Sequence, residues 1–348
     1  MEANERWEDL AASLPAAVTA ILTPGAPVVV TGCAGFIGST LTEALLALGC
    51  RVTGVDALTD YYDPALKREN LAGCVGHPDF TFVEKHLEEL DAVDLLAGQR
   101  AVFHLAAQAG VRASWGASFA DYLGRNVMAT QRLLEACKEP AVRDSLVRFV
   151  YSSSSSVYGD QPALPVTEAA LPQPRSPYGV TKMAAEHLCV LYSMNFGVPT
   201  SSLRYFTVFG PRQRPDMAFR KYIEAALDGR VFEVFGDGSQ TRDFTYVGDA
   251  VRSNLLAVAC AEPWEVFNTG GGSRLVFSDT LATLQGILQD RVPGLAAQVA
   301  YRETAKGDVK DTFADRTHVE RTIGYRPTID FAAGLAREVD WAIARRRA

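Results

Sequence analysis

The chain has 348 residues and a formal net charge of −7, and 48% of its residues are hydrophobic while 22% are charged. This length allows one large or two modest domains with an ample core, and the composition is that of an ordinary globular protein. The acidic balance argues against nucleic acid or an anionic membrane surface as the main partner, so an anionic ligand would need a local basic pocket.

The cysteines and the N-terminal segment indicate a cytoplasmic protein. The six cysteines are scattered and form no Cys-x-x-Cys pair, which predicts reduced thiols rather than disulfides or a metal site. No run of about 18 apolar residues occurs, so no membrane-spanning segment is expected. Acidic residues stand where a signal peptide needs a basic region, so none is expected, and residues 6–22 instead have the pattern of a short amphipathic helix.

From residue 25 onward, apolar strand-like runs alternate with helical patterns, as in a parallel sheet covered by helices. Beyond about residue 208 this alternation breaks into loops, short strands and helices. The expected strands cover 27–30, 51–56, 80–83, 101–105, 148–151 and 198–205. The expected domains are a helical extension over 1–24, a nucleotide-binding domain over 25–207, and a smaller interleaved α/β domain over 208–348. Segments near 240–270 of this last part are expected to return to the nucleotide-binding domain.

A glycine-rich turn follows the first predicted strand, where Gly32, Gly35 and Gly38 precede a helix. Glycines permit a tight turn and close approach of a pyrophosphate, and the helix N-terminus then offers backbone donors. Asp56 ends the next strand, where a carboxylate binds a ribose 2′-hydroxyl and repels a 2′-phosphate. The pattern predicts a Rossmann-type doubly wound sheet that binds NAD in preference to NADP. A loop that binds no phosphate is the alternative.

Tyr178 and Lys182 lie one turn apart on a helix that Ser176-Pro177 is expected to begin. An ammonium group beside a phenol lowers the pKa of the phenol, which makes a usable general base near neutral pH. Taken alone, such a pair more often belongs to a solvated helix face.

In this order the glycine turn, Asp56, His104-Leu105-Ala106-Ala107, Val157-Tyr158-Gly159 and the Tyr178–Lys182 pair resemble the extended short-chain dehydrogenases/reductases, the NAD-dependent epimerase/dehydratase family. The resemblance covers about residues 26–340. It implies that Tyr178 and Lys182 act in catalysis with Ser154, although Ser153 or Ser155 could take the serine's place. It also implies contacts to NAD from Gly32, Gly35, Phe36, Ile37, Gly38, Asp56, Leu105, Ala106, Ala107, Asn126, Tyr178, Lys182 and Tyr205.

Two cofactor positions depart from the family pattern. His86 stands where an aspartate usually meets the adenine, and Ala57 replaces a common asparagine beside Asp56. We therefore expect weaker adenine contacts or contacts through the backbone, with NAD binding retained.

The residues after Ser154 distinguish reaction classes within the family. Dehydratases carry Asp-Glu there, because elimination of water needs its own acid and base, and the related decarboxylases carry Glu at the second position. This chain has Ser155-Ser156. What remains is oxidation of an alcohol followed by return of the hydride to the opposite face, which is epimerisation.

Three stretches, 60–67, 108–112 and 212–218, resemble UDP-glucuronate 4-epimerases, although each could also be an ordinary surface loop. The resemblance implies substrate contacts from Ser154, Ser155, Ser156, Arg112, Thr207, Arg214, Arg242 and Asp308. Hydroxyl groups would hold the glucuronate carboxylate without supplying an acid, while Thr207 could instead only pack a strand. Lys306 replaces a usual proline before Asp308, so the shape of that loop is open.

The sequence thus predicts interconversion of UDP-glucuronate and UDP-galacturonate by a cytoplasmic homodimer with tightly held NAD and no metal. The alternatives are a UDP-glucuronate decarboxylase, a neutral UDP-hexose 4-epimerase and a non-catalytic NAD-binding regulator.

Overall fold

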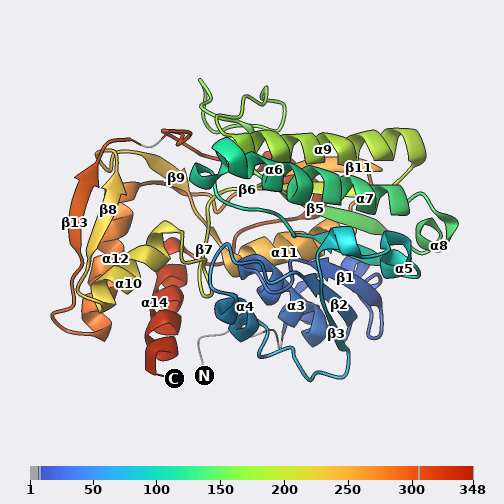
Figure 1. Cartoon of the computed structure of the whole chain (residues 1–348), viewed down its shortest axis with the longest axis horizontal. Coiled ribbons are helices and arrows are strands. Elements are labelled where there is room, and N and C mark those ends of the chain that lie inside the picture. Colours follow the sequence, from blue (N-terminus) through green and yellow to red (C-terminus); the bar gives the residue numbers. More distant parts are fainter. Residues whose placement is uncertain (1–6, 8, 305, 348) are drawn as a thin grey trace.

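A seven-stranded sheet forms the centre of the computed structural model, which describes residues 7, 9–304 and 306–347 (Figure 1). All six strand pairings are parallel, and the spatial order is β11-β6-β5-β4-β1-β2-β3. This confirms the predicted Rossmann-type parallel sheet. The strands are Pro27–Thr31 (β1), Arg51–Asp56 (β2), Phe80–Glu84 (β3), Ala101–His104 (β4), Arg148–Ser154 (β5), Thr200–Tyr205 (β6) and Trp264–Thr269 (β11).

Helices cover both faces of this sheet, which explains why its strands are almost continuously apolar (Figure 1). In β1, Val28 and Val30 belong to one core cluster and Val29 to the other, because successive side chains point to opposite faces. On one face lie α3 (Phe36–Ala47), α4 (Pro64–Asn70) and α11 (Val247–Ala257). On the other lie α5 (Ala92–Leu96), α6 (Phe119–Tyr122), α7 (Ala129–Ala136) and α9 (Pro177–Phe196).

The long helix α9 begins where the sequence predicted. The Ser176 side chain accepts a hydrogen bond from the backbone N–H of Gly179, and Pro177 occupies the first turn. The helix ends at Gly197, which has a left-handed backbone with φ of 69°. This start places Tyr178 in the first turn, at the end of the helix that faces the loops after the strands.

The remaining elements form a smaller unit beside the sheet, on the left in Figure 1. Its strands β8 and β13 pair in parallel, β9 pairs with β12, and β7 pairs with β10. From this region the chain returns to the main sheet through α11 and β11. The elements are β7 (Val208–Phe209), α10 (Ala218–Leu227), β8 (Val231–Phe235), β9 (Thr241–Asp243), β10 (Thr245–Tyr246), β12 (Arg274–Val276), α12 (Phe277–Arg291), β13 (Gln298–Arg302), α13 (Thr317–Ile323) and α14 (Phe331–Arg347).

The N-terminal segment forms two short helices, α1 (Leu10–Ser13) and α2 (Ala16–Thr19), rather than the single predicted helix. The break falls at Leu14, which has extended backbone because it precedes Pro15. Both helices bury leucine and valine side chains in the core beside the sheet, and Arg252 of α11 donates a hydrogen bond to the Ser13 carbonyl at 2.8 Å. The start of the predicted helix, at residue 6, lies outside the described residues.

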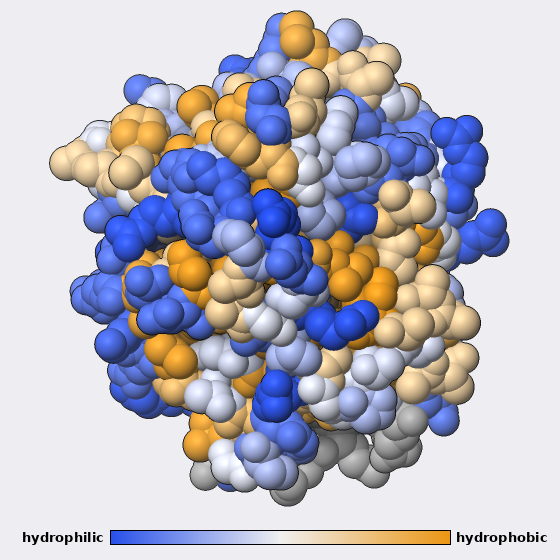
Figure 2. Space-filling model, turned by 90° about the vertical axis from the view of Figure 1, so that its right-hand side faces the viewer, coloured by the Kyte–Doolittle hydropathy of each residue, from blue (hydrophilic) through white to orange (hydrophobic). Residues whose placement is uncertain are grey.

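On the face turned to the right in Figure 1, hydrophilic residues are interspersed with small hydrophobic patches (Figure 2). Across the described part of the chain, no helix has the length and apolar character needed to cross a membrane.

Candidate active site

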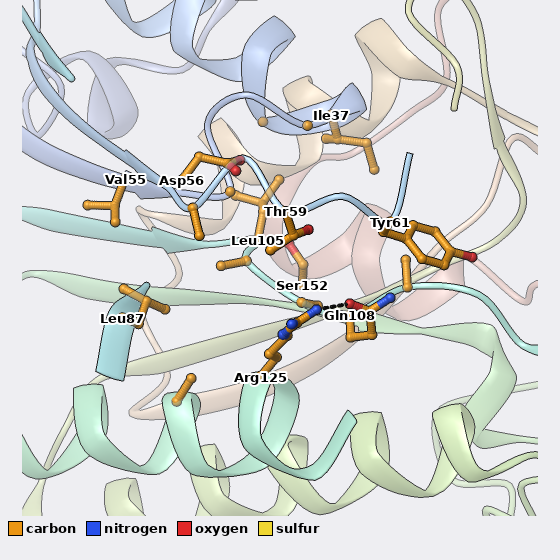
Figure 3. Close-up of a pocket in the computed structure, with 18 of the residues that line it drawn as sticks. Ile37, Val55, Asp56, Thr59, Tyr61, Leu87, Leu105, Gln108, Arg125 and Ser152 are labelled. Atoms are coloured by element: carbon orange, nitrogen blue, oxygen red, sulfur yellow. Dashed lines mark hydrogen bonds between the residues drawn. The ribbon is translucent and has the colours of Figure 1, made fainter. Parts of the chain in front are cut away.

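A cavity lies at the carboxyl ends of the central strands (Figure 3). Strands β4 and β2 flank β1 on opposite sides, so the strand order reverses here, and ligands of such sheets bind at this point. The walls of the cavity come from the glycine turn after β1, the end of β2, the segment after β3, the loop after β4, the end of β5 and the start of α9.

The glycine turn is packed so closely that side chains are excluded. A Cβ atom on Gly38 would lie 2.1 Å from the Gly32 carbonyl oxygen, and one on Gly32 would lie 2.8 Å from the Ala106 nitrogen. Gly32 also has a φ of +72°, which favours glycine. The turn therefore presents bare backbone to the cavity, as close approach of a diphosphate requires.

Asp56 joins the glycine turn to the end of β2. Its carboxylate accepts hydrogen bonds from the backbone N–H of Ala34 at 3.1 Å and of Leu58 at 2.8 Å. Burial raises the pKa of this carboxyl group, and the charge of Lys67 opposes the shift. Together, the turn and the carboxylate fit the diphosphate and ribose of NAD.

Twelve of the thirteen predicted NAD contacts line this cavity: Gly32, Gly35, Phe36, Ile37, Gly38, Asp56, Leu105, Ala106, Ala107, Tyr178, Lys182 and Tyr205. Lys85, His86 and Leu87 line it as well, so the segment that departs from the family pattern does face the cavity.

Asn126 is the exception, because it lies behind the cavity wall. Its side chain is 1% exposed; it accepts a hydrogen bond from the Gln108 N–H and donates to the Gln108 carbonyl and the Thr181 hydroxyl. Asn126 therefore supports the Gln108 loop from behind the cavity wall, and its contact with NAD stays a prediction. Its neighbour Arg125 points into the cavity from the π-helical turn Leu123–Met128 and donates to the Gln108 side chain at 2.6 Å (Figure 3).

Sequence reasoning missed Arg125 and the Gln108 side chain. An arginine in a helical pattern carries no local sign that it faces a cavity. The π-helical turn that directs it inward is stabilised by hydrogen bonds to a distant loop.

The catalytic candidates Tyr178, Lys182 and Ser154 come together at one end of the cavity. The Ser154 side chain lies near the Tyr178 phenol and favours its ionised form, and the Lys182 ammonium lies 4.6 Å from the centre of the Tyr151 ring. Burial raises the pKa of Tyr178, while Arg214 and Ser154 oppose that shift. Burial also lowers the pKa of Lys182 to about 7.

The directions of these two pKa shifts contradict one prediction made from the sequence. The sequence led us to expect a phenol whose pKa is lowered by Lys182, but in the protein alone the pKa of Tyr178 is raised. The reason is that both groups are removed from water, so each neutral form is favoured.

The consecutive serines at the end of β5 each contact a different partner. The Ser152 hydroxyl lies 3.3 Å from that of Tyr205, and the Ser153 hydroxyl donates to Glu186 at 2.7 Å. The Ser154 hydroxyl accepts from the Ser156 N–H at 3.1 Å and lies near the Tyr178 phenol. The short 3-10 turn Ser155–Val157 follows directly, so Ser155 and Ser156 leave the strand in a turn that packs against α9.

Of the predicted substrate arginines, Arg214 lines the cavity. It forms an ion pair with Asp216 through two contacts of 2.9 and 3.0 Å, and Tyr61 donates to the same carboxylate at 3.3 Å. Thr207 is partly exposed, and its carbonyl accepts a hydrogen bond from the Thr245 N–H at 3.0 Å.

Arg112, Arg242 and Asp308 form a second group outside the lining of this cavity. Arg112 pairs with Asp308 at 2.7 Å and lies over the Phe235 ring, 4.1 Å from its centre. Arg242 donates to the carbonyl groups of Thr241, Val309 and Lys310. Both Arg112 and Asp308 were predicted to contact substrate. In this structure they form an ion pair with each other.

Comparison with known proteins agrees with this geometry. Residues 28–270 match the family model described as the NAD dependent epimerase/dehydratase family. The chain belongs to this family.

Individual relatives cover nearly the whole chain. An uncharacterized UDP-glucose epimerase, YtcB, of Bacillus subtilis (strain 168) is 39% identical over 319 residues, which are 90% of this chain and 96% of that protein. A UDP-glucuronate 4-epimerase of Thermodesulfobacterium geofontis is 35% identical over 316 residues, with coverage of 90% and 95%. The crystal structure of UDP-glucuronic acid 4-epimerase from Bacillus cereus, in complex with UDP-glucuronic acid and NAD, has a TM-score of 0.86 and 40% identity. It covers 92% of this chain and 99% of that one.

As a member of the NAD dependent epimerase/dehydratase family, the protein is an NAD-dependent enzyme. The glycine turn and Asp56 would hold the diphosphate and ribose, and bound NAD supplies a hydride acceptor beside Tyr178.

Proposed function

We propose that the enzyme interconverts UDP-glucuronate and UDP-galacturonate through a 4-keto intermediate. The observation that carries this proposal is the end of β5, where Ser154 lies near Tyr178 and Ser155 and Ser156 form the turn that packs against the start of α9. Dehydration needs an additional acid and base at this place, and serines supply neither near neutral pH.

Each catalytic residue has a stated role in this proposal. Tyr178 removes the proton of the C4 hydroxyl and later returns it, while the Ser154 hydroxyl donates to the developing oxyanion. Lys182 holds the nicotinamide ribose and stabilises the phenolate. Arg214, whose guanidinium group lines the cavity, binds the diphosphate of the UDP-sugar and adds positive charge that favours ionised Tyr178.

The glucuronate carboxylate must be kept from leaving as carbon dioxide once C4 is oxidised. Hydroxyl groups of Ser154, Ser155, Ser156 and Thr207 would hold it by hydrogen bonds without protonating the ring. The buried carboxylate nearest to these serines, Glu186, is paired with Arg204 and bonded to Ser153, so it does not serve as an acid for decarboxylation.

The named relatives support the substrate class. The Thermodesulfobacterium protein is a UDP-glucuronate 4-epimerase, and the Bacillus cereus enzyme was crystallised with UDP-glucuronic acid and NAD. A neutral UDP-hexose 4-epimerase is the second candidate, because the Bacillus subtilis relative is described as a UDP-glucose epimerase.

Product analysis tests the proposal. The enzyme is incubated with UDP-glucuronate, or in parallel with UDP-glucose, and the products are separated by chromatography and identified by NMR. We expect UDP-galacturonate from the first substrate and at least tenfold slower turnover of the second. A UDP-pentose and carbon dioxide without galacturonate would establish decarboxylation instead, and preferred turnover of UDP-glucose would establish the neutral epimerase.

The cellular setting belongs to the same proposal. We place the enzyme in the cytoplasm, as its six free and buried cysteines favour a reducing compartment. We also propose a homodimer, for which the exposed apolar side chains Leu191, Met194 and Phe196 of α9 offer a contact surface. Residues 25–207 would bind NAD and 208–348 mainly the nucleotide sugar. Arg112, Arg242 and Asp308 would bind the nucleotide after the Arg112–Asp308 pair opens.

A further inference from the structure

A buried ion pair lies directly beneath the catalytic residues. Glu186 and Arg204 have side chains that are 3% and 6% exposed, and both carboxylate oxygens accept hydrogen bonds from the guanidinium group, at 2.6 and 3.0 Å. Glu186 lies on α9, one turn after Lys182 and two turns after Tyr178, while Arg204 lies on β6. The pair thus joins the catalytic helix to the centre of the sheet.

The pair also reaches the strand that carries Ser154. The Ser153 hydroxyl donates to the Glu186 carboxylate at 2.7 Å, and Ser153 immediately precedes Ser154 on β5. Arg204 donates in turn to the Tyr158 hydroxyl at 2.6 Å, which donates to Asn268 of β11 at 2.7 Å. One carboxylate is therefore bonded to groups that fix the relative positions of Tyr178, Lys182 and Ser154.

The charge of Glu186 acts on Lys182. The titratable groups that face the Lys182 ammonium are Glu186 and Cys189 of its own helix, Tyr151 of β5 and His104 of β4, and Tyr178 lies one turn before it. Burial raises the pKa of Cys189 and of Tyr151 and lowers that of His104 to about 3, so these three are neutral near pH 7. Among the groups facing Lys182, Glu186 is the anion.

A contribution to folding stability does not by itself explain why this buried ion pair is present. Removing two charges from water is costly, and buried ion pairs can often be replaced by apolar residues without loss of stability. The position of this pair, between the catalytic ammonium and the serine strand, points to a role in the reaction.

We propose that Glu186 is a positioning residue for the hydride-transfer step: through Ser153 and Arg204 it holds α9 against β5, and its negative charge keeps Lys182 protonated. This role applies to oxidation of any UDP-sugar by Tyr178, so it rests on the proposed function only in requiring such a substrate.

The test compares three variants as NAD complexes. Glu186→Gln removes the charge but keeps an acceptor for Ser153. Because this substitution leaves the buried Arg204 unpaired, Glu186→Gln combined with Arg204→Gln provides a second form with no buried charge. Glu43→Gln is the matched control, because it removes the carboxylate of another largely buried pair, with Arg212 at 2.6 Å.

In Glu186→Gln we expect the alkaline limb of the kcat profile to move to lower pH by about one unit, a tenfold loss of rate at a fixed alkaline pH. The double variant loses one charge of each sign, so its alkaline limb should move in the same direction by less. KM is expected to change less than threefold. NMR titration of labelled lysine, with Lys182 assigned by its loss in Lys182→Arg, should show the same shift without any turnover. Glu43→Gln should lower the melting temperature and leave both pH profiles unmoved.

The two readouts separate this proposal from the proposed function. Lack of turnover with either UDP-sugar would reject the proposed function, while the NMR titration would still decide the role of Glu186. If Lys182 titrates at the same pH in the wild-type enzyme and the folded Glu186 variants, the pair is structural only and the inference is wrong.

Discussion

At the scale of single residues, the site contains a phenol and a lysine amine whose charged forms are both disfavoured by burial in the protein alone. Burial favours neutral Tyr178 and neutral Lys182, while Arg214 and Ser154 pull the phenol toward its ionised form. A base in this setting becomes effective when positive charge is added beside it, as the nicotinamide ring of NAD⁺ does when bound.

The first residue-scale prediction concerns the base itself. Replacing Tyr178 with phenylalanine removes the hydroxyl that we propose exchanges the proton, so kcat should fall by about 10²- to 10⁴-fold. NAD should stay bound, because the glycine turn and Asp56 are unchanged. Product chromatography and the NAD content of the purified protein check the two parts.

Tyr192→Phe is the control for this change. Tyr192 lies on the same helix, and its hydroxyl contacts Gln131 and Glu135 away from the cavity. Its removal should leave kcat within twofold. A Tyr178→Phe enzyme with near-normal turnover would show that another group is the base.

The predicted NAD contacts that line the cavity are those whose position depends on local backbone shape. Gly32, Gly38 and Asp56 follow apolar strands, and the order of strands and turns fixes where they lie. Asn126 and Arg125 differ from these residues, because their hydrogen bonds are to Gln108. Gln108 lies in the loop after β4, outside the helical turn that carries them. The pKa directions of Tyr178 and Lys182 were equally unreadable, because burial is a property of the folded chain.

At the scale of elements, the glycine turn and the helix α3 that follows it form the most constrained junction. The short distance from a Gly38 Cβ to the Gly32 carbonyl means that any side chain must displace backbone. The serine cap of α9 and the break between α1 and α2 are set by local rules in the same way, through Ser176 and Pro15. The sequence predicts the first of these, whereas the amphipathic pattern over 6–22 predicts one helix that Pro15 in fact divides.

Gly38→Ala should therefore disrupt NAD binding. The added methyl group meets backbone at 2.1 Å, so the turn must open, and we expect at least a tenfold rise in the Kd for NAD with a lower melting temperature. Gly286→Ala is the matched control, because Gly286 lies inside α12 and its Cβ would have open space. Alanine favours a helix interior by about 0.5–1 kcal/mol, so the control should be slightly stabilised. Calorimetry for NAD and thermal melts measure both, and equal NAD affinity in the two variants would refute the packing argument.

At the scale of the whole molecule, two C-terminal segments pack against earlier parts of the chain. It returns to the main sheet through β11, and its last helix, α14, packs against β7 and β10 next to the start of α11. Sequence patterns predicted the parallel sheet because each strand is apolar on both faces. The pairings of the short strands β7, β9, β12 and β13 were not predicted, since two- to five-residue segments carry too little pattern.

Glu338 links α14 to the backbone directly after β7. One carboxylate oxygen accepts a hydrogen bond from the Gly210 N–H at 2.8 Å, while the other is buried and has no hydrogen-bond partner among the described residues. Burial raises the pKa of this side chain to about 8, and the charge of Arg220 opposes the shift. The folded protein therefore keeps a proton at Glu338 that the unfolded chain releases near the ordinary pKa of 4.5.

Because of this difference in pKa, the contribution of Glu338 to the free energy of unfolding falls as the pH rises. The contribution of Glu338 is fully present below pH 4.5 and is lost progressively as the pH rises toward 8, because unfolding then releases a proton. Glu338→Gln keeps an oxygen for the Gly210 N–H and cannot ionise. Relative to wild type, its melting temperature should rise by a few degrees between pH 5 and pH 8. Thermal melts of both proteins at matched ionic strength give the difference directly, because groups common to both proteins cancel. Curves that stay parallel over this range would mean that Glu338 titrates alike in the folded and unfolded chains, and that α14 is held by packing alone.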